Sequence, residues 1–292
     1  MAAQLAVNGI IAGAVVLLLA SSFVLIFTTV RFFHFAHGVV FTAGAYFTFL
    51  LSTWAGVPVI PSALLAVLLS GALGSLMELA IYRPLRHKGA SSLVLLLCSL
   101  GLYVILQNVI SVVFGDDVQT IRAEVVREGI NVAGARVTLV QMLTVAVSVV
   151  LVTGLLLFLR KTPLGRTIRA VANDAELASV SGIDSDRVIL WAFAIGSALA
   201  GVAGILVALD VDMTPTMGLN ALMMGVVAVI IGGANSIPGI ALGALLLGMA
   251  QQFGVWWISS QWQDAIAFII LLAFLLFRPQ GFMGRKVKKA VV

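Results

Sequence analysis

Two histidines, His34 and His37, are the side chains best suited to chemistry, and they lie three residues apart in the segment 32–44. On a helix they would share one face, as paired metal ligands or proton carriers do. A metal site needs further ligands, and neither Cys98 nor a nearby carboxylate supplies one. We therefore expect the two imidazoles to form hydrogen bonds or pack between helices, and we expect no metal site.

The sequence contains no known catalytic or nucleotide-binding motif. There is no GxSxG nucleophile elbow, no HExxH metalloprotease motif and no Gly-rich phosphate loop followed by Lys and Ser or Thr. No apolar run carries an arginine ladder or a ring of acids, which would indicate a voltage sensor or a cation filter. We expect this chain to have no catalytic residues and to bind no cofactor of its own.

The composition indicates a membrane protein. Of 292 residues, 61% are hydrophobic and only 10% are charged, whereas a soluble domain carries about 25% charged residues. Several charge-free runs approach the roughly 20 residues that span a bilayer. The net charge of +5 follows from basic loops under the positive-inside rule and does not require a nucleic-acid partner.

The apolar runs predict an all-α, polytopic bundle of about eight or nine transmembrane segments, some short and broken by Gly or Pro. We treat residues 1–292 as a single transmembrane domain with a polar loop at about 160–187. The expected spans are at about 5–30, 39–54, 61–82, 91–114, 137–159, 188–209, 219–231, 237–254 and 264–277.

Basic residues gather in three clusters between these spans, which predicts that all three are cytoplasmic. The clusters are Arg83, Arg86 and Lys88; Arg160, Lys161, Arg166, Arg169 and Arg187; and Arg278, Arg285, Lys286, Lys288 and Lys289. The loops 115–136 and 210–218 are then outside, and the C-terminus is cytoplasmic. If the run 39–54 crosses fully, the N-terminus is outside, which we favour because it leaves Arg31 in the cytoplasm.

Two segments break the helical pattern, 32–44 and 232–239. Irregular backbone at membrane depth persists only where protein or a water-filled cavity covers it, and Gly/Pro-interrupted segments often mark a transporter's pathway. Tight turns at the cytoplasmic interface are the alternative. The candidate pathway residues are His34, Phe35, His37, Gly38, Gly44, Met224, Gly232, Gly233, Ser236 and Pro238.

Glu78 and Asp264 are the acidic residues closest to membrane depth, and both lie near the ends of spans. We expect Glu78 to lie near the interface, snorkelling or paired with Arg83 about one turn away. A carrier driven by an ion gradient usually keeps ionisable groups mid-membrane. Their placement favours transport energised by a partner over a gradient-driven carrier; a channel or scaffold would accumulate nothing against a gradient.

The segment 162–183 predicts a pair of short helices. Thr162 suits an N-cap with Pro163 in the first turn, Asp174 and Glu176 suit the start of a second helix, and Gly182 suits its end. In the first helix Leu164, Ile168 and Val171 share one face, away from Arg166 and Arg169. Such a hairpin either docks on another protein or is an ordinary solvated loop.

Six stretches together resemble the permease subunits of branched-chain amino-acid ABC importers, in particular the shorter, LivH-like subunit. The resemblance covers nearly the whole chain and rests on the order and spacing of these pieces. They are FAHG at 35–38, YRPLR at 82–86, SLGLYVILQN at 99–108, LGRTIRAVANDAELASVSGI at 164–183, IGSALAGVAGIL at 195–206, and the Gly-rich run between 232 and 248.

The resemblance implies a multi-pass subunit of a bacterial or archaeal plasma membrane, paired with a homologous permease or with itself. It implies two cytoplasmic ATP-binding subunits that carry ATP and magnesium, and an extracytoplasmic substrate-binding protein. The segment 162–183 matches the loop that presses into the ATPase subunit. The matching residues, with Glu176 beside them, are Arg166, Arg169, Asp174, Ala178 and Gly182.

The chain departs from the family pattern at His34, where Asn is usual, and around Met224, where a Lys-Ala-Phe run is common. The resemblance as a whole implies branched-chain or related amino acids as substrates. A permease of the same superfamily for amides or urea, for aromatic or other organic acids, or for sugars stays open, as does a gradient-driven carrier.

Overall fold

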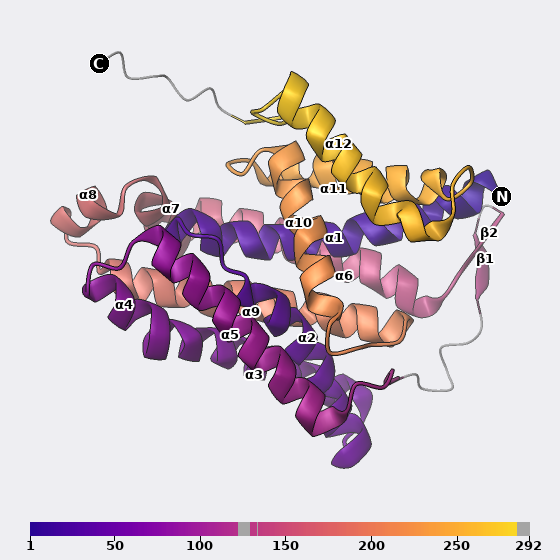
Figure 1. The fold of residues 1–292 in the computed structure, drawn as a ribbon, viewed down its shortest axis with the longest axis horizontal. Helices are drawn as coiled ribbons and strands as arrows, with labels where there is room; N and C mark the ends of the chain where they lie inside the picture. The colour runs from indigo at the N-terminus through magenta and orange to yellow at the C-terminus, as the bar shows by residue number, and fades with distance from the viewer. Residues whose placement is uncertain (122–128, 133, 285–292) are drawn as a thin grey trace.

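The computed structural model describes residues 1–121, 129–132 and 134–284, and it is built almost entirely of helices (Figure 1). Residues 122–128 and 133 of the loop 115–136, and the basic residues Arg285, Lys286, Lys288 and Lys289, lie outside the described residues. The helices are α1 (Ala2–Val30), α2 (Ala36–Phe49), α3 (Val59–Met77), α4 (Arg83–His87), α5 (Ser92–Phe114), α6 (Leu139–Lys161), α7 (Pro163–Asn173), α8 (Ala175–Val180), α9 (Ser185–Asp210), α10 (Met217–Gly232), α11 (Ile237–Gly254) and α12 (Gln263–Phe277).

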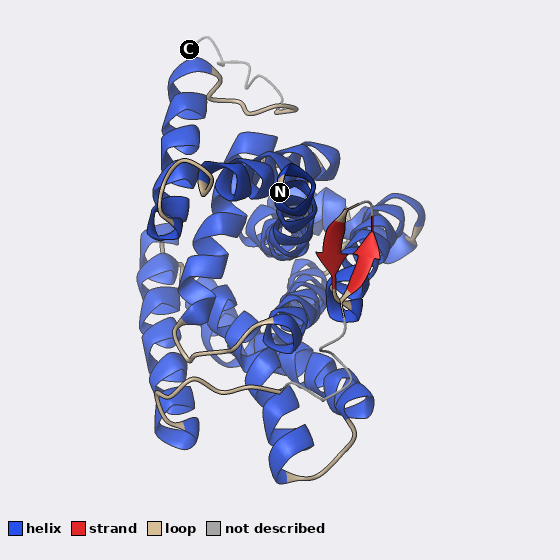
Figure 2. Ribbon diagram, turned by 90° about the vertical axis from the view of Figure 1, so that its right-hand side faces the viewer, coloured by secondary structure: helices blue, strands red, loops and turns tan. Residues whose placement is uncertain are grey.

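The helices fall where the charge-free runs predicted them. Within the described residues, eight continuous helical segments are long and apolar enough to cross a bilayer, some of them (36–54, 59–87 and 260–277) joining an α-helix to an adjacent π- or 3-10-helical turn, and α10 is a shorter apolar helix. Because no water is present in the hydrocarbon core to satisfy backbone groups, helices are the expected solution for such a sequence. The predicted all-α, multi-pass architecture is confirmed. One short antiparallel pair, β1 (Ile130–Val132) with β2 (Ala135–Val137), precedes α6 (Figure 2).

The centre of the bundle is formed by α1, α2, α9 and α10. α1 packs against α11, α9, α10 and α6, while α9 also packs against α3 and α2. The helices α5, α6 and α12 are mostly exposed along their apolar residues. Such faces suit lipid or another membrane subunit rather than water.

Glycines allow the central helices to approach closely. A Cβ atom on Gly44 of α2 would lie 2.5 Å from the carbonyl oxygen of Gly201 in α9, and one on Gly38 would lie 2.7 Å from that of Gly218. Gly204, in the small-residue stripe of α9, lies against the backbone of Phe41. These distances leave no room for a side chain, so larger residues there would force the helices apart.

The N-terminus and the α7–α8 hairpin lie at opposite ends of the bundle (Figure 1). Near the N-terminus, Gln4 accepts a hydrogen bond from the backbone of Arg136 at 2.8 Å. The run 36–54 extends through the bundle. After α2, a π-helical turn (Leu50–Trp54) brings Trp54 to the end of α5, where the ring centroids of Trp54 and Phe114 are 5.0 Å apart. The segment 39–54 therefore traverses the bundle, and the N-terminus lies at the end away from the hairpin. That the N-terminus is outside stays a prediction.

Candidate functional site

The hairpin of α7 and α8 is closed by the capping residues that the sequence predicted. Thr162 Oγ1 accepts a hydrogen bond from the backbone of Gly165 at 3.0 Å, and Pro163 begins α7. The carboxylate of Asp174 accepts from the backbone N–H groups of Glu176 and Leu177, each at 3.0 Å. Gly182, with φ of 85°, follows α8 in a left-handed conformation that favours glycine. The predicted helix pair is confirmed.

The apolar stripe of α7 turns inward. Ile168 and Val171 are buried against the chain's own helices, and Leu164 is half-buried. α7 contacts α6, α1 and α9, so this stripe fixes the hairpin to the membrane helices and is not free for a partner. The exposed apolar side chains are instead Leu177 and Val180 on α8, which are 62% and 83% exposed.

The remaining predicted hairpin residues divide between surface and interior. Arg166, Arg169, Asp174 and Glu176 are exposed, while Ala178 is buried. The exposed face of the hairpin is thus a mixed surface in which arginines and carboxylates flank Leu177 and Val180. Sequence reasoning did not single out these two apolar residues, although their spacing of three on a short helix was a usable signal.

Arg31 ties the hairpin to the end of α1. Its backbone adopts the left-handed conformation with φ of 57°, and its guanidinium donates hydrogen bonds to the carbonyl oxygens of Ala172 and, at 3.3 Å, Asn173. These carbonyls belong to the last turn of α7, where backbone acceptors lack helical partners and a cation is favoured. Arg31 thus joins α1 and α7 through a contact between residues far apart in the chain.

A charge network joins the end of the third span to the start of α9. Glu78 is fully buried in a π-helical turn, Glu78–Tyr82, and its carboxylate accepts from Arg86 at 2.5 and 3.0 Å. Arg86 also contacts Asp186 at 3.2 Å, and Asp186 in turn binds Arg83 and His87 at 3.1 and 2.7 Å. Glu78 is therefore paired, as expected, but with Arg86 instead of Arg83, which reaches Asp186.

His34 and His37 lie in a buried aromatic cluster. Neither side chain has exposed surface; His34 Nδ1 is 3.1 Å from the hydroxyl of Tyr82, and His37 Nε2 is 2.9 Å from the hydroxyl of Ser22. Burial, together with nearby His37, holds the pKa of His34 well below its ordinary value. Among the described residues, no three His, Cys, Asp or Glu side chains gather into a possible metal site.

The other predicted pathway residues are distributed between helix crossings and a turn. Phe35 donates its backbone N–H to Ser99 of α5 at 3.1 Å, and Gly38 and Gly44 lie at the glycine contacts described above. Met224 is buried beside Gln251, whose amide lies 3.5 Å from its sulfur. The structure thus places the α2 residues and Met224 between packed helices.

The segment 232–239 is a tight turn between α10 and α11. Gly232 lies against the backbone of Gly239 and Ile240, and Gly233 lies against Gln280 and Gly284. Ser236 caps α11 by accepting from the backbone of Gly239 at 3.1 Å, with Pro238 in the first turn of that helix. Ser236 and Pro238 also line a cavity of about 690 Å³. Its walls come from α1, the end of α6, α7 and this turn, so the cavity brings the hairpin and the predicted pathway segment together.

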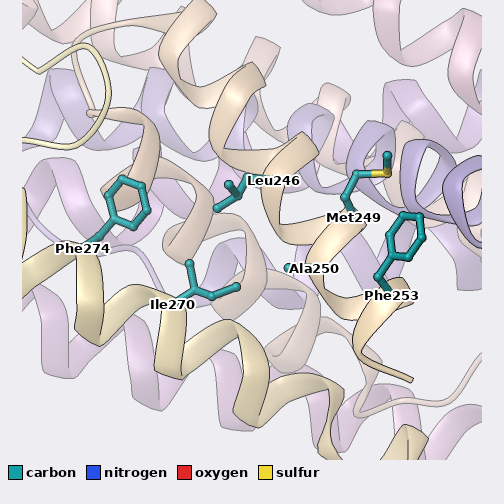
Figure 3. Close-up of a pocket in the computed structure, with 6 residues that line it drawn as sticks. All are labelled: Leu246, Met249, Ala250, Phe253, Ile270 and Phe274. Atoms are coloured by element: carbon teal, nitrogen blue, oxygen red, sulfur yellow. The ribbon is translucent and has the colours of Figure 1, made fainter. Parts of the chain in front are cut away.

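A second cavity, of about 380 Å³, lies between α11 and α12 (Figure 3). It is lined only by apolar residues, with Ile270 and Phe274 of α12 facing Leu246, Met249, Ala250 and Phe253 of α11. It presents no side-chain group that could bind a polar solute or do chemistry.

We expect His34→Leu to lower the free energy of unfolding by about 1–3 kcal/mol, because the hydroxyl of Tyr82 would be buried without its partner. Tyr82→Phe alone should cost a similar amount, and the double variant should cost less than the sum. Unfolding of the purified chain in detergent, followed by tryptophan fluorescence, measures all three. Additive losses would show that the two side chains do not interact.

Comparison with known proteins relates the chain to one family over nearly its whole length. A family model described as the branched-chain amino acid transport system permease component matches residues 5–275. The high-affinity branched-chain amino acid permease BraD of Pseudomonas aeruginosa is 33% identical, covering 97% of this chain and 95% of its own. LivH of Escherichia coli K12 is 31% identical, covering 95% and 94%.

Among solved structures, PsaBC from Streptococcus pneumoniae in complex with Fab contains a chain with a similar fold. The TM-score is 0.54 at 13% sequence identity, covering 94% of this chain and 91% of that one; this likeness concerns the fold alone. The sequence relatives and the family model, taken with the eight apolar helices, identify the chain as a member of the branched-chain amino acid transport system permease family.

Proposed function

We propose that this chain is a transmembrane subunit of an ABC importer and forms part of the path for branched-chain or related amino acids. Two cytoplasmic ATP-binding subunits would hydrolyse ATP, and an extracytoplasmic binding protein would deliver the substrate. A second permease, homologous or identical, would complete the membrane path. The end-to-end similarity to BraD and LivH, which are high-affinity branched-chain amino acid permeases, supports the substrate class.

The observation that carries the coupling proposal is the exposed face of α8. Leu177 and Val180 project from a hairpin whose helices are capped and whose Ile168 and Val171 side chains are buried in the bundle. Two exposed apolar side chains on one short helix that also carries the exposed Glu176 suit a small protein interface. We assign this face to contact with the ATP-binding subunit.

The charge distribution supports a cytoplasmic position for the hairpin. Arg31, Arg160, Arg166 and Arg169 lie at one end of the bundle with Arg86 of the charge network, whereas the described part of the loop 115–136 contributes Asp116, Asp117 and Arg136 at the other. Basic residues are retained on the cytoplasmic side during insertion. We therefore propose that the N-terminus is outside and the hairpin inside.

The test is uptake of radiolabelled leucine, isoleucine and valine into proteoliposomes that contain the whole complex and enclosed ATP. We expect accumulation that requires ATP and the binding protein and is unaffected by discharging proton and sodium gradients. Uptake without the ATP-binding subunits that stops when the gradients are discharged would establish a carrier instead. Competition by amides, urea, aromatic acids and sugars in the same assay defines the substrate class.

A further inference from the structure

The 690 Å³ cavity beside the hairpin contains three arginines and no carboxylate among its described lining residues. Arg31 follows α1, Arg160 lies in the last turn of α6, and Arg169 lies on α7. Within the described chain, neither Arg160 nor Arg169 forms an ion pair. Three cations around one cavity repel one another, so an anion bound between them would be stabilised by all three.

A fully buried hydroxyl lies at the inner end of the same cavity. Ser21 lines the cavity, has no exposed surface, and its Oγ forms no hydrogen bond with any described residue. A buried hydroxyl without a partner costs free energy, so its position indicates that a polar group of a bound molecule, or of water, reaches it. This feature is independent of the arginines at the mouth.

The floor of the cavity is apolar. Val24 and Leu25 of α1 and Leu156 and Leu159 of α6 line it, between Ser21 and the arginines. Together with Thr28, the α1 residues form one stripe along the last three turns of that helix. The cavity is therefore a groove beside α1 and α6 in which this apolar stretch lies between the arginines and the Ser21 hydroxyl, with Thr28, Asn173, Asn235 and Ser236 as further polar lining.

We propose that this groove binds the phosphate headgroup of an anionic phospholipid at Arg31, Arg160 and Arg169, with part of an acyl chain along Leu25 and Leu156. Basic pockets between transmembrane helices on the cytoplasmic side suit such headgroups. The apolar floor favours a lipid over a soluble oxyanion, since inorganic phosphate would leave that floor unfilled. The bound lipid contacts both α7 and the 234–238 turn, whose residues line the same cavity.

The test measures lipid retained by the delipidated full-length chain in detergent, using native mass spectrometry. We expect phosphatidylglycerol to bind at least tenfold more tightly than phosphatidylcholine with the same acyl chains. Because each arginine near an anionic headgroup contributes about fivefold in affinity, Arg160→Gln with Arg169→Gln should weaken phosphatidylglycerol binding roughly thirtyfold. The matched control is Arg166→Gln, which removes an exposed arginine from the same helix but outside the cavity; it should leave lipid binding unchanged.

A second variant tests the apolar floor. Leu156→Trp fills the groove without changing its charge, and it should reduce retention of phosphatidylglycerol in a chain that still folds. Equal binding of the two lipids by the wild type, or unchanged binding by both the double arginine variant and Leu156→Trp, would overturn the proposal. Thermal protection by inorganic phosphate or L-leucine, and not by phosphatidylglycerol, would also overturn it and assign the cavity to a small soluble solute. These outcomes are separate from the transport assay, because they require no partner subunit.

Discussion

Glu78→Leu should lower the free energy of unfolding by about 3 kcal/mol, because it leaves the guanidinium of Arg86 without its buried partner. Removing one member of a buried ion pair costs about 3–5 kcal/mol. We expect the lower end of that range, since the Arg86 side chain is 18% exposed and keeps Asp186 at 3.2 Å. Titration of the purified chain with SDS in mixed micelles, followed by tryptophan fluorescence, measures the change.

Two variants control this result. Arg83→Gln breaks an ion pair with the same Asp186, but its side chain is 43% exposed, so it should cost less than about 1 kcal/mol. Glu78→Leu combined with Arg86→Met replaces the buried pair with apolar groups and should recover most of the lost stability. If Glu78→Leu costs no more than Arg83→Gln, the buried pair does not stabilise the bundle.

Leu177→Asp combined with Val180→Asp should weaken binding of the ATP-binding subunits about a hundredfold or more. Burying each side chain at an interface contributes roughly 1.5 kcal/mol or more, and about 1.4 kcal/mol corresponds to tenfold in affinity. ATP-dependent uptake should fall accordingly. The dissociation constant of the ATP-binding subunits from the detergent-solubilised permease, measured by biolayer interferometry, tests this expectation.

The matched control is Ser179→Asp, which adds a negative charge to the same exposed helix without removing an apolar side chain. It should retain most of the affinity. All three positions are exposed, so the variants should unfold like the wild type. Equal loss in Ser179→Asp would mean that charge on α8 weakens the complex, and no loss in the double variant would show that α8 does not contact the ATP-binding subunit.

The hairpin and the helices could be predicted from the sequence because their determinants are local. Thr162, Pro163, Asp174 and Gly182 act on backbone groups within a few residues, so their types suffice to place the ends of α7 and α8. The spans follow in the same way from uninterrupted apolar runs. Periodicity further predicted that Ile168 and its neighbours share a face, but not what covers that face.

The contacts that the sequence missed depend on tertiary geometry. The partner of Glu78 is Arg86 because the helix passes through a π-helical turn and then α4, which carries Arg86 back toward the carboxylate and Arg83 toward Asp186. Arg31 reaches α7 only because its own backbone is left-handed. Residues from four separate segments line the cavity, so no residue spacing within a single segment could have predicted it.

Thr162 has a mechanical consequence for the subunit. It ends α6, where its hydroxyl donates to the carbonyl of Phe158 at 2.8 Å, and it also caps α7 by accepting from Gly165. No linker residue separates the two helices, and the absence of a side chain at Gly165 lets α7 lie directly on the backbone of Leu159. α6 and α7 therefore form one rigid, bent unit. A movement of α8 would be transmitted to α6, a helix of 23 residues that is about 35 Å long, because no flexible linker separates the two helices.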